Sequence, residues 1–169
     1  MMGRVRMLCL VAALVAYCAQ VHAQPIVVID SAGKAAGRLL NESVALVDAT
    51  VGVVAPASIR PIYASDGKAA SGLATWQSGG TVLFTSADCT AGGFVHSPAL
   101  AGARGAAQVE TREGIVLYVG AIGMPTTQAV RSILYDTGCS PVSVRQNGLH
   151  PVVVTVNLSS RFPPPLSLQ

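Results

Sequence analysis

The triplet Asp136-Thr137-Gly138 is the pattern in this chain that comes nearest to a catalytic motif. It follows the apolar run Ile133-Leu134-Tyr135, and a buried strand that leads into Asp-Thr-Gly can present a carboxylate for acid–base chemistry. Such chemistry uses two aspartates that share one proton, and the chain has no second copy of the triplet. Residues 139–169 also leave little room for the later strands of an aspartic protease. We therefore interpret the triplet as a turn that ends a strand and positions Cys139.

The histidines are not accompanied by a nucleophile motif. The chain lacks Gly-x-Ser-x-Gly, so a Ser/His/Asp site would have to be assembled from His96 or His150 and one of many serines. We expect both histidines at strand ends on the surface, and Glu110 and Glu113 at a solvated hairpin tip. A phosphate-cradling Gly-x-x-x-x-Gly-Lys-Ser/Thr is also missing from the sequence. The sequence therefore predicts no catalytic, cofactor-binding or metal-binding residue, and it favours a protein that is not an enzyme.

The first 23 residues have the pattern of a secretory signal peptide. Arg4 and Arg6 precede an apolar run over residues 7–19, and Val21-His22-Ala23 is typical of a cleavage site with small residues. The run has about 13 residues, fewer than the roughly 17–25 that a membrane-spanning helix needs. We expect cleavage between Ala23 and Gln24, no stable membrane span in the mature chain, and a location in the periplasm, outside the cell or on its surface.

Cys89 and Cys139 are the cysteines of the expected mature chain, since Cys9 and Cys18 fall in the leader. Exported proteins fold in an oxidising compartment, where two cysteines outside any Cys-x-x-Cys motif favour a structural disulfide. Closing a loop of about 50 residues would stabilise the fold by roughly 4 kcal/mol through the unfolded state. The sequence therefore predicts a bridge between Cys89 and Cys139.

The charge distribution argues against a nucleic-acid partner. The whole chain has a formal net charge of +3, from 11 basic and 8 acidic residues. Loss of Arg4 and Arg6 with the leader would bring this to about +1, and the other arginines are scattered singly from Arg38 to Arg161. Nucleic-acid binding needs basic residues gathered on one face. Residues 24–169 have the length of a single domain with one core.

Short runs rich in Val, Ile, Leu, Tyr and Thr alternate with Gly, Pro, Asp and Ser clusters, which predicts an all-β domain. We expect a small antiparallel sandwich or a partly open barrel of short strands. Residues 25–55 are a candidate hairpin extension, and residues 97–106 are expected to form a long surface loop. Residues 162–169, with three prolines, are expected to form an extended tail on a sheet edge or outside the sheet. The expected strands are residues 25–30, 37–40, 44–47, 52–55, 60–64, 72–76, 81–85, 93–96, 107–111, 115–119, 129–135, 141–145 and 152–158.

Large side chains are few, because aromatic residues make up only 5% of the chain. A β-domain of this size needs them in its interior, so we expect them to be core residues rather than a platform for sugar rings. This applies to Trp76, Phe84, Phe94, Tyr118 and Tyr135. The core is predicted to contain Val82, Phe84, Leu117, Val119, Ile133, Tyr135 and Val154.

One short stretch of the chain recurs. Gly33-Lys34-Ala35-Ala36-Gly37-Arg38-Leu39 is similar to Gly67-Lys68-Ala69-Ala70-Ser71-Gly72-Leu73, and both follow an Asp-bearing turn. Two copies are too few for a solenoid, and we interpret them as chance similarity among Ala and Gly residues. The apolar density of residues 25–55 also leaves open a self-assembly through exposed strand edges.

Three blocks of the chain carry a resemblance to other proteins. They are Val28-Ile29-Asp30-Ser31-Ala32-Gly33 with Gly37-Arg38-Leu39-Leu40, Val82-Leu83-Phe84-Thr85-Ser86-Ala87-Asp88-Cys89-Thr90 followed by Gly92-Gly93, and Val156-Asn157-Leu158-Ser159-Ser160-Arg161-Phe162-Pro163-Pro164-Pro165-Leu166-Ser167-Leu168. As a set they resemble a group of uncharacterised exported bacterial β-domain proteins, some with a collagen-like or other repetitive region. The group also has a late cysteine after a Leu-Tyr strand, here Leu117-Tyr118. The resemblance implies an envelope or surface β-domain and carries over no catalytic residues.

Together these observations favour a non-enzymatic β-domain, secreted or in the cell envelope, with a binding or structural role. No cofactor is expected, and the candidate partners are a protein, a glycan and a second copy of the chain. One alternative is a secreted hydrolase whose site gathers His96 or His150 with Asp and Ser groups. Another is a small outer-membrane barrel of about eight strands, which would need uninterrupted segments of roughly ten alternating residues that this sequence does not contain.

Overall fold

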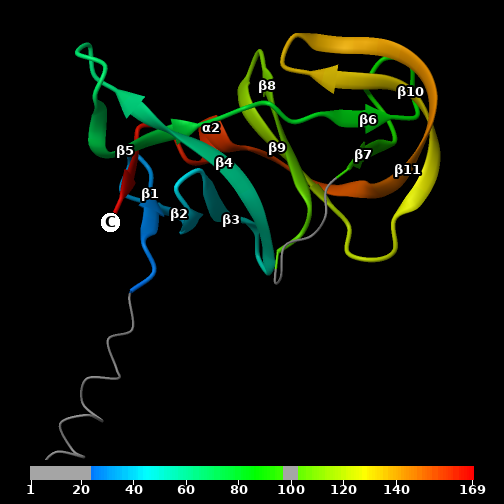
Figure 1. Ribbon diagram of the computed structural model, residues 1–169. Helices are drawn as coiled ribbons and strands as arrows, with labels where there is room; N and C mark the ends of the chain where they lie inside the picture. The colour runs from blue at the N-terminus through cyan, green and yellow to red at the C-terminus, as the bar shows by residue number, and fades with distance from the viewer. Residues whose placement is uncertain (1–23, 97–102) are drawn as a thin grey trace, which may run out of the picture.

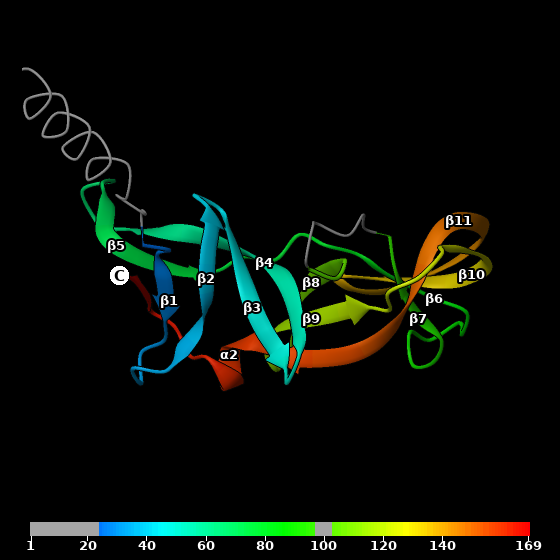
Figure 2. The same ribbon diagram turned by 90° about the horizontal axis from the view of Figure 1, so that it is seen from below.

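A computed structural model describes residues 24–96 and 103–169 of the chain. The expected leader, residues 1–23, and residues 97–102 of the expected surface loop lie outside the described residues. The described chain is built almost wholly of antiparallel strands, which confirms the all-β prediction. The strands form two lobes that lie side by side, a closed six-stranded barrel and a six-stranded sheet (Figure 1, Figure 2).

The barrel combines strands from the first half of the chain with one strand from its end. Around the barrel the order is β1-β12-β5-β4-β3-β2, so β12 pairs with β1 on one side and with β5 on the other. The expected strands at 52–55 and 60–64 merge into one, β4. The barrel strands are β1 (Val27–Ile29), β2 (Ala35–Asn41), β3 (Val44–Thr50), β4 (Val53–Tyr63), β5 (Ala69–Trp76) and β12 (Leu166–Leu168).

Closure by β12 corrects two expectations. Residues 162–169 do not form a tail on an edge or outside the sheet, because Leu166 pairs with Ala74 and Leu168 pairs with Val28. The prolines before Leu166 lack N–H groups, but the residues of β12 have them and complete the ladder. Residues 25–55 are not a hairpin extension either, since β1, β2 and β3 are each paired on both sides within the barrel and the start of β4 pairs with β3. The edges of β1, β2 and β3 are therefore unavailable for the self-assembly that the sequence had left open, whereas residues 53–55 of β4 have one neighbouring strand.

The sheet lobe has the strand order β10-β6-β7-β11-β9-β8, and β10 also pairs with β11. Strand β11 is 20 residues long and changes partner along its length. It pairs with β10 as far as Leu149, with β7 at His150 and Pro151, and with β9 up to Asn157. Its length joins the expected strands at 141–145 and 152–158. The strands of this lobe are β6 (Val82–Phe84), β7 (Gly93–Val95), β8 (Ala106–Thr111), β9 (Gly114–Gly120), β10 (Thr126–Tyr135) and β11 (Gly138–Asn157).

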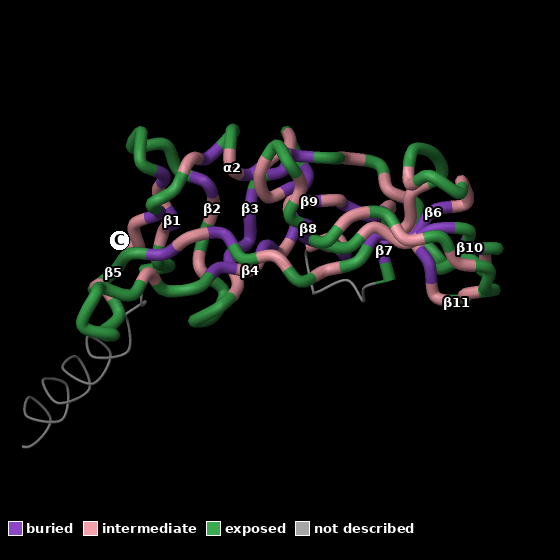
Figure 3. Tube along the Cα trace, turned by 90° about the horizontal axis from the view of Figure 1, so that it is seen from above, coloured by how far each residue is buried: buried purple, intermediate pink, exposed green. Residues whose placement is uncertain are grey.

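A single apolar cluster joins the two lobes. It combines the interior of the barrel with Leu117 and Val119 of β9 and Val156 of β11, and Figure 3 shows buried segments running through both lobes. Burial alternates along β4, the pattern of a strand with one face on a core. A barrel of few strands has a narrow interior, and small side chains suit it. The buried alanines of the barrel are Ala36, Ala45, Ala49, Ala55, Ala57 and Ala74.

Most of the predicted core residues are buried. Val82, Phe84, Leu117 and Val119 are fully or almost fully buried, whereas Ile133 and Val154 are half-buried and pack against the clusters. Tyr135 was predicted wrongly, because it ends β10 beside the β10–β11 turn and its side chain is 37% exposed.

The aromatic residues do not share one surface. Trp76 lies in the core that joins the lobes, where its Nε1 donates a 2.9 Å hydrogen bond to the carbonyl of Phe162. Phe84 belongs to a separate cluster in the sheet lobe, whereas Tyr135 is exposed on that lobe. The five aromatic residues therefore do not form a common platform for sugar rings.

The two copies of the recurring stretch form the same turn. In the first, the N–H of Asp30 donates to the carbonyl of Lys34 and the N–H of Gly33 to that of Asp30. In the second, the N–H of Ala64 donates to the carbonyl of Lys68 and the N–H of Gly67 donates to the carbonyl of Ala64. The first turn joins β1 to β2 in the unit β1-β2-β3, and the second joins β4 to β5 in the unit β4-β5-β12. The two three-stranded units together form the barrel. The similarity thus has a structural counterpart, a shared turn geometry.

Barrel closure predicts a large effect at Leu166. Leu166→Ala removes a fully buried side chain from β12 and should lower the free energy of unfolding by about 2–5 kcal/mol, measured by urea denaturation. The matched change Leu40→Ala, at a side chain 49% exposed on β2, should cost less than about 1 kcal/mol. Equal losses in the two variants would contradict the closing role of β12.

Candidate functional site

The Asp136-Thr137-Gly138 triplet is a structural turn. Tyr135 pairs with Gly138, so the triplet forms the tight turn between β10 and β11, and Gly138 takes a positive φ of 116°. The Asp136 carboxylate accepts a 2.7 Å hydrogen bond from the N–H of Glu110 on β8. The Asp136 carboxylate therefore satisfies a backbone N–H group on the outer edge of β8. Left unpaired, that group would be free to hydrogen-bond with a strand of another chain.

The predicted cysteine pair is joined. Cys89 and Cys139 form a disulfide whose Cα atoms are 5.9 Å apart, and it ties the β6–β7 loop to the start of β11. Cys89 takes a left-handed φ of 57°, and its N–H donates to the Oγ of the buried Ser132. That hydroxyl in turn donates a 2.7 Å hydrogen bond to the carbonyl of Ser86. The bridge and these hydrogen bonds hold the loop against β10, which is a structural role.

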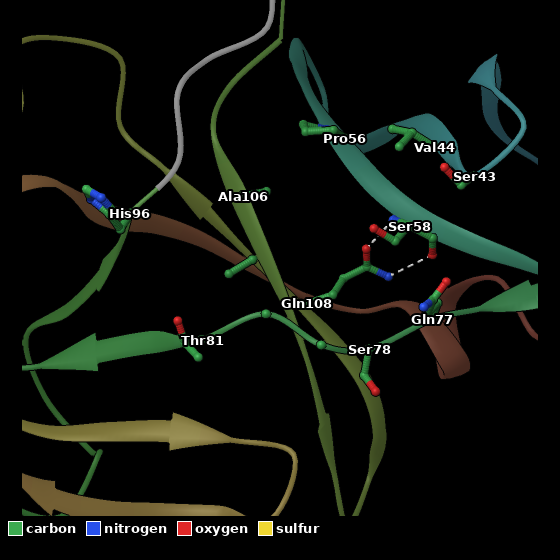
Figure 4. A pocket seen from close by; sticks show the side chains of 13 residues that line it. Ser43, Val44, Pro56, Ser58, Gln77, Ser78, Thr81, His96, Ala106 and Gln108 are labelled. Carbon is green, nitrogen blue, oxygen red and sulfur yellow. Dashed lines mark hydrogen bonds between the residues drawn. The ribbon is translucent and has the colours of Figure 1, made fainter.

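An open cleft of about 740 Å³ lies between the two lobes. The β2–β3 turn and β4 form its barrel side, the connection from β5 to β6 crosses it, and β8 and the end of β7 form its sheet side (Figure 4). Polar side chains from all three parts point toward it. The lining residues are Ser43, Val44, Pro56, Ser58, Gln77, Ser78, Gly79, Gly80, Thr81, His96, Ala106, Ala107 and Gln108.

Gln108 joins the two lobes at the base of this cleft. Its side-chain Oε1 accepts a hydrogen bond from the N–H of Ser58 on β4, and its Nε2 donates to the carbonyl of Ser58 at 3.2 Å. The amide group thus pairs with one residue of the barrel as a neighbouring strand would. Gln108 is buried, and both polar atoms of its side chain have partners, so the bridge avoids the cost of an unpaired buried amide.

Gly80 allows the β5–β6 connection to cross β8. Its N–H donates a 2.7 Å hydrogen bond to the carbonyl of Gln108. A Cβ atom at this position would lie 2.7 Å from the nitrogen of Gln108 and 2.8 Å from its oxygen, both backbone atoms that cannot move aside. Glycine is therefore required here, and the connection 77–81 is held across the cleft.

His96 lies at the sheet side of the cleft with one ring nitrogen already engaged. Its Nδ1 is 3.1 Å from the carbonyl oxygen of Gly148. Since a carbonyl only accepts, Nδ1 must carry the proton, and Nε2 of the neutral ring is then an acceptor. A Cβ at Gly148 would lie 2.7 Å from Cε1 of His96, so the glycine makes room for the ring. His150 pairs with Val95 on the neighbouring strand and is not part of the lining.

The described lining of the cleft consists of uncharged side chains and one titratable group, the His96 imidazole. None of the side chains that line it in the described chain is a carboxylate, an ammonium or a guanidinium. The cleft thus brings His96 together with serines, as the hydrolase alternative required, but it supplies no Asp to orient the imidazole. The arrangement is suited to hydrogen bonding with an uncharged molecule.

The sequence alone pointed to one of these residues, His96, and to none of the others. Ser43, Thr81 and Gln108 lie on three different segments that only the tertiary fold brings together. The one available signal was Gln108 itself, a polar residue between Ala107 and Val109 in an expected strand. A polar side chain at such a position needs a partner, and here that partner is Ser58.

Comparison of the chain with protein-family models, with curated proteins and with solved structures found no match. Over residues 24–96 and 103–169, no helix has both the length and the apolar character needed to cross a membrane. In the same part of the chain, no three His, Cys, Asp or Glu side chains gather in a way that would hold a metal ion.

The hydrogen bonds between Gln108 and Ser58 predict that truncation of the Gln108 side chain lowers the stability of the fold. Gln108→Ala leaves the N–H of Ser58 without its partner and should lower the free energy of unfolding by about 1–3 kcal/mol. Gln128→Ala, at a side chain whose one hydrogen bond is long and exposed, should change it by less than about 0.5 kcal/mol. Thermal unfolding of the two variants measures the difference, and an unchanged Gln108→Ala protein would show that the lobes are joined by other contacts.

The loop that contains Cys89 should show a pH response at Asp88. A hydrogen bond from the Thr90 hydroxyl, 2.6 Å long, and one from Ser86 lower the pKa of Asp88 below its ordinary value of 3.8. Because the folded pKa is lower than the unfolded one, the carboxylate stabilises the loop above pH 3.8 and this contribution is lost as the pH falls through the folded pKa. An NMR titration of Thr90→Val should show the pKa of Asp88 rising toward the ordinary value, and Thr127→Val should leave it unchanged. The same pKa in all three proteins would refute the assignment.

Proposed function

We propose that this chain is an exported β-domain that acts as a binding module, with the cleft between its lobes as the ligand site. The observation that carries the proposal is the cleft, an open hollow of about 740 Å³ with uncharged donors and acceptors on both walls. Ligand sites in proteins have volumes of about 300–1,000 Å³ and combine apolar surface with a few placed polar groups. The cleft has this size, and its lining is more polar than that of a typical site, with seven polar side chains and four apolar ones.

Two features support the exported location. Residues 1–23 have the basic, apolar and small-residue segments of a secretory leader. The Cys89–Cys139 disulfide is compatible with an oxidising compartment. The resemblance to exported bacterial β-domains points in the same direction and is part of the proposal.

The walls of the cleft are preorganised, which favours binding. The Gln108 side chain holds β8 to β4, and the hydrogen bond from Gly80 holds the crossing connection to β8. Gln77 is fixed through its own N–H, which donates to the carbonyl of Ser58. A ligand that enters such a site does not have to order its walls, and that reduces the entropic cost of binding.

A hydrolase is the second candidate, and one observation favours it. The Gly148 carbonyl leaves Nε2 of His96 as a base in a cleft that contains serine and threonine hydroxyls. Without a carboxylate in the lining, the imidazolium that forms during catalysis would have no ion-pair partner there. We therefore place this function below ligand binding.

The proposal is tested by NMR with a panel of small probes on the mature chain, residues 24–169. The panel contains uncharged sugars, uncharged amides and dipeptides, and anionic and cationic counterparts. We expect at least one class to shift the resonances of the cleft residues, and Thr81→Trp, which fills the cleft from an exposed position, to abolish the shifts. The control is Ser65→Trp, at the exposed β4–β5 turn and outside the lining of the cleft, which should retain them.

Two results would count against binding in the cleft. In the first, no probe shifts the cleft resonances. In the second, Thr81→Trp binds as tightly as the unchanged protein. Turnover of an ester or glycoside probe that is lost in His96→Ala would instead favour the hydrolase.

A further inference from the structure

We infer that the ligand of this cleft is a neutral oligosaccharide, an inference that rests on the proposed binding function. Four properties of the cleft support it: the lack of charged groups, the hydrogen-bonding groups, the apolar surface and the pairing of the surrounding strands. Each of these properties excludes a class of ligand or favours sugars.

The absence of charged side chains from the described lining excludes ionic ligands. A carboxylate, phosphate or ammonium group moved into a partly dehydrated cleft loses hydration, and only an opposite charge or several hydrogen bonds restore that energy. The lining offers no such charge. Nucleotides, phosphorylated compounds and uronic acids are therefore poor ligands. Neutral sugars have no charged group to dehydrate when they bind.

The polar groups of the lining match sugar hydroxyls. Ser43 lies in the β2–β3 turn, Gln77 follows β5, and Thr81 precedes β6, and their side chains point toward the cleft from different directions (Figure 4). Hydroxyl and amide groups both donate and accept, as each sugar hydroxyl does. Nε2 of His96 adds an acceptor, because its other ring nitrogen donates to Gly148. The side chains of Ser43, Gln77 and Thr81 are solvent-accessible and therefore available to a ligand.

Between these polar groups the lining supplies small apolar side chains. Val44 and Pro56 lie on the barrel side, and Ala106 and Ala107 lie on β8. Each is half-buried, so part of its surface is in contact with solvent in the cleft. Sugar rings have apolar C–H faces between their hydroxyl edges, and surfaces of this kind bury such faces. The small size of the alanines lets a ring approach the strand closely.

The pairing of the strands disfavours an extended peptide, the other neutral polymer that would fit an open cleft. Peptides commonly bind by adding a strand to a free sheet edge. Strands β3, β6 and β7 are paired on both sides, whereas residues 53–58 of β4 pair with β3 alone. On the other edge of this segment, the carbonyl of Val54 accepts from the N–H of Arg104, Pro56 has no N–H, and Ser58 is bonded to the Gln108 side chain. On the outer edge of β8, the carbonyl of Gln108 accepts from Gly80 and the N–H of Glu110 donates to Asp136. A peptide backbone would find these two groups already engaged.

The inference is tested by calorimetry and ligand-observed NMR on residues 24–169. The neutral probes are the trisaccharides of α-1,4-, β-1,4- and β-1,3-linked glucose and the trimer of N-acetylglucosamine. The comparison probes are trigalacturonate, the glucosamine trimer and an uncharged, end-blocked tripeptide. We expect one or more neutral trisaccharides to bind, with charged analogues at least tenfold weaker.

Variants of two lining residues test whether the trisaccharide binds in the cleft. Gln77→Ala and Thr81→Val each remove one hydrogen-bonding side chain, and each should weaken the binding of the neutral trisaccharide by about 2- to 12-fold. The controls are Gln128→Ala and Thr127→Val on β10, which make the same chemical changes outside the lining and should leave affinity unchanged.

The outcomes separate the inference from the proposed function. If trigalacturonate, the glucosamine trimer or the peptide binds in preference to the neutral sugars and is weakened by the lining variants, the inference is overturned and the binding function stands. If no probe of any class depends on Gln77 or Thr81, both are overturned.

Discussion

The narrow interior of the barrel is the constraint on which the rest of the structure depends. A barrel of six strands has a narrow interior, and the buried alanines of β2, β3, β4 and β5 leave room in it for larger side chains such as Ile59 and Leu166. The barrel closes only when β12 lies between β1 and β5. The chain must therefore return from the sheet lobe through β11 and α2 (Leu158–Arg161), and this return fixes the sheet beside the barrel.

The cleft is a consequence of how the lobes meet. They share an apolar cluster through β9 and β11, but at β8 the contact is a polar one, the side chain of Gln108 against the backbone of Ser58. Where apolar packing ends, a hollow open to solvent remains, and the β5–β6 connection crosses it. Its walls thus belong to elements that the core holds in place, which is the arrangement that a binding site needs.

Sequence reasoning succeeded where the signals are local. Alternating apolar runs located most strands, the Asp-bearing turn expected before the first copy of the recurring stretch is present at Asp30, and so is the expected disulfide. It failed where a residue's environment depends on distant segments. Nothing near Leu166 indicates that its partner is Ala74, and nothing near Gln77 indicates that His96 faces the same cleft. Tyr135 fits a strand by composition, but its place beside a turn left it exposed. Strand periodicity specifies which residues share a face, not which other strand covers that face.

The pairing of β1 with β12 also sets the order in which this protein can fold. β1 is the first described strand of the chain and β12 is the last, so the ladder between them joins residues at opposite ends of the sequence. Until β12 has been synthesised and has docked, one edge of β1 and one edge of β5 have no partner, and the barrel cannot close. Closure of this lobe therefore has to follow synthesis of the whole sheet lobe, and the open barrel before it exposes two strand edges to pairing with other chains.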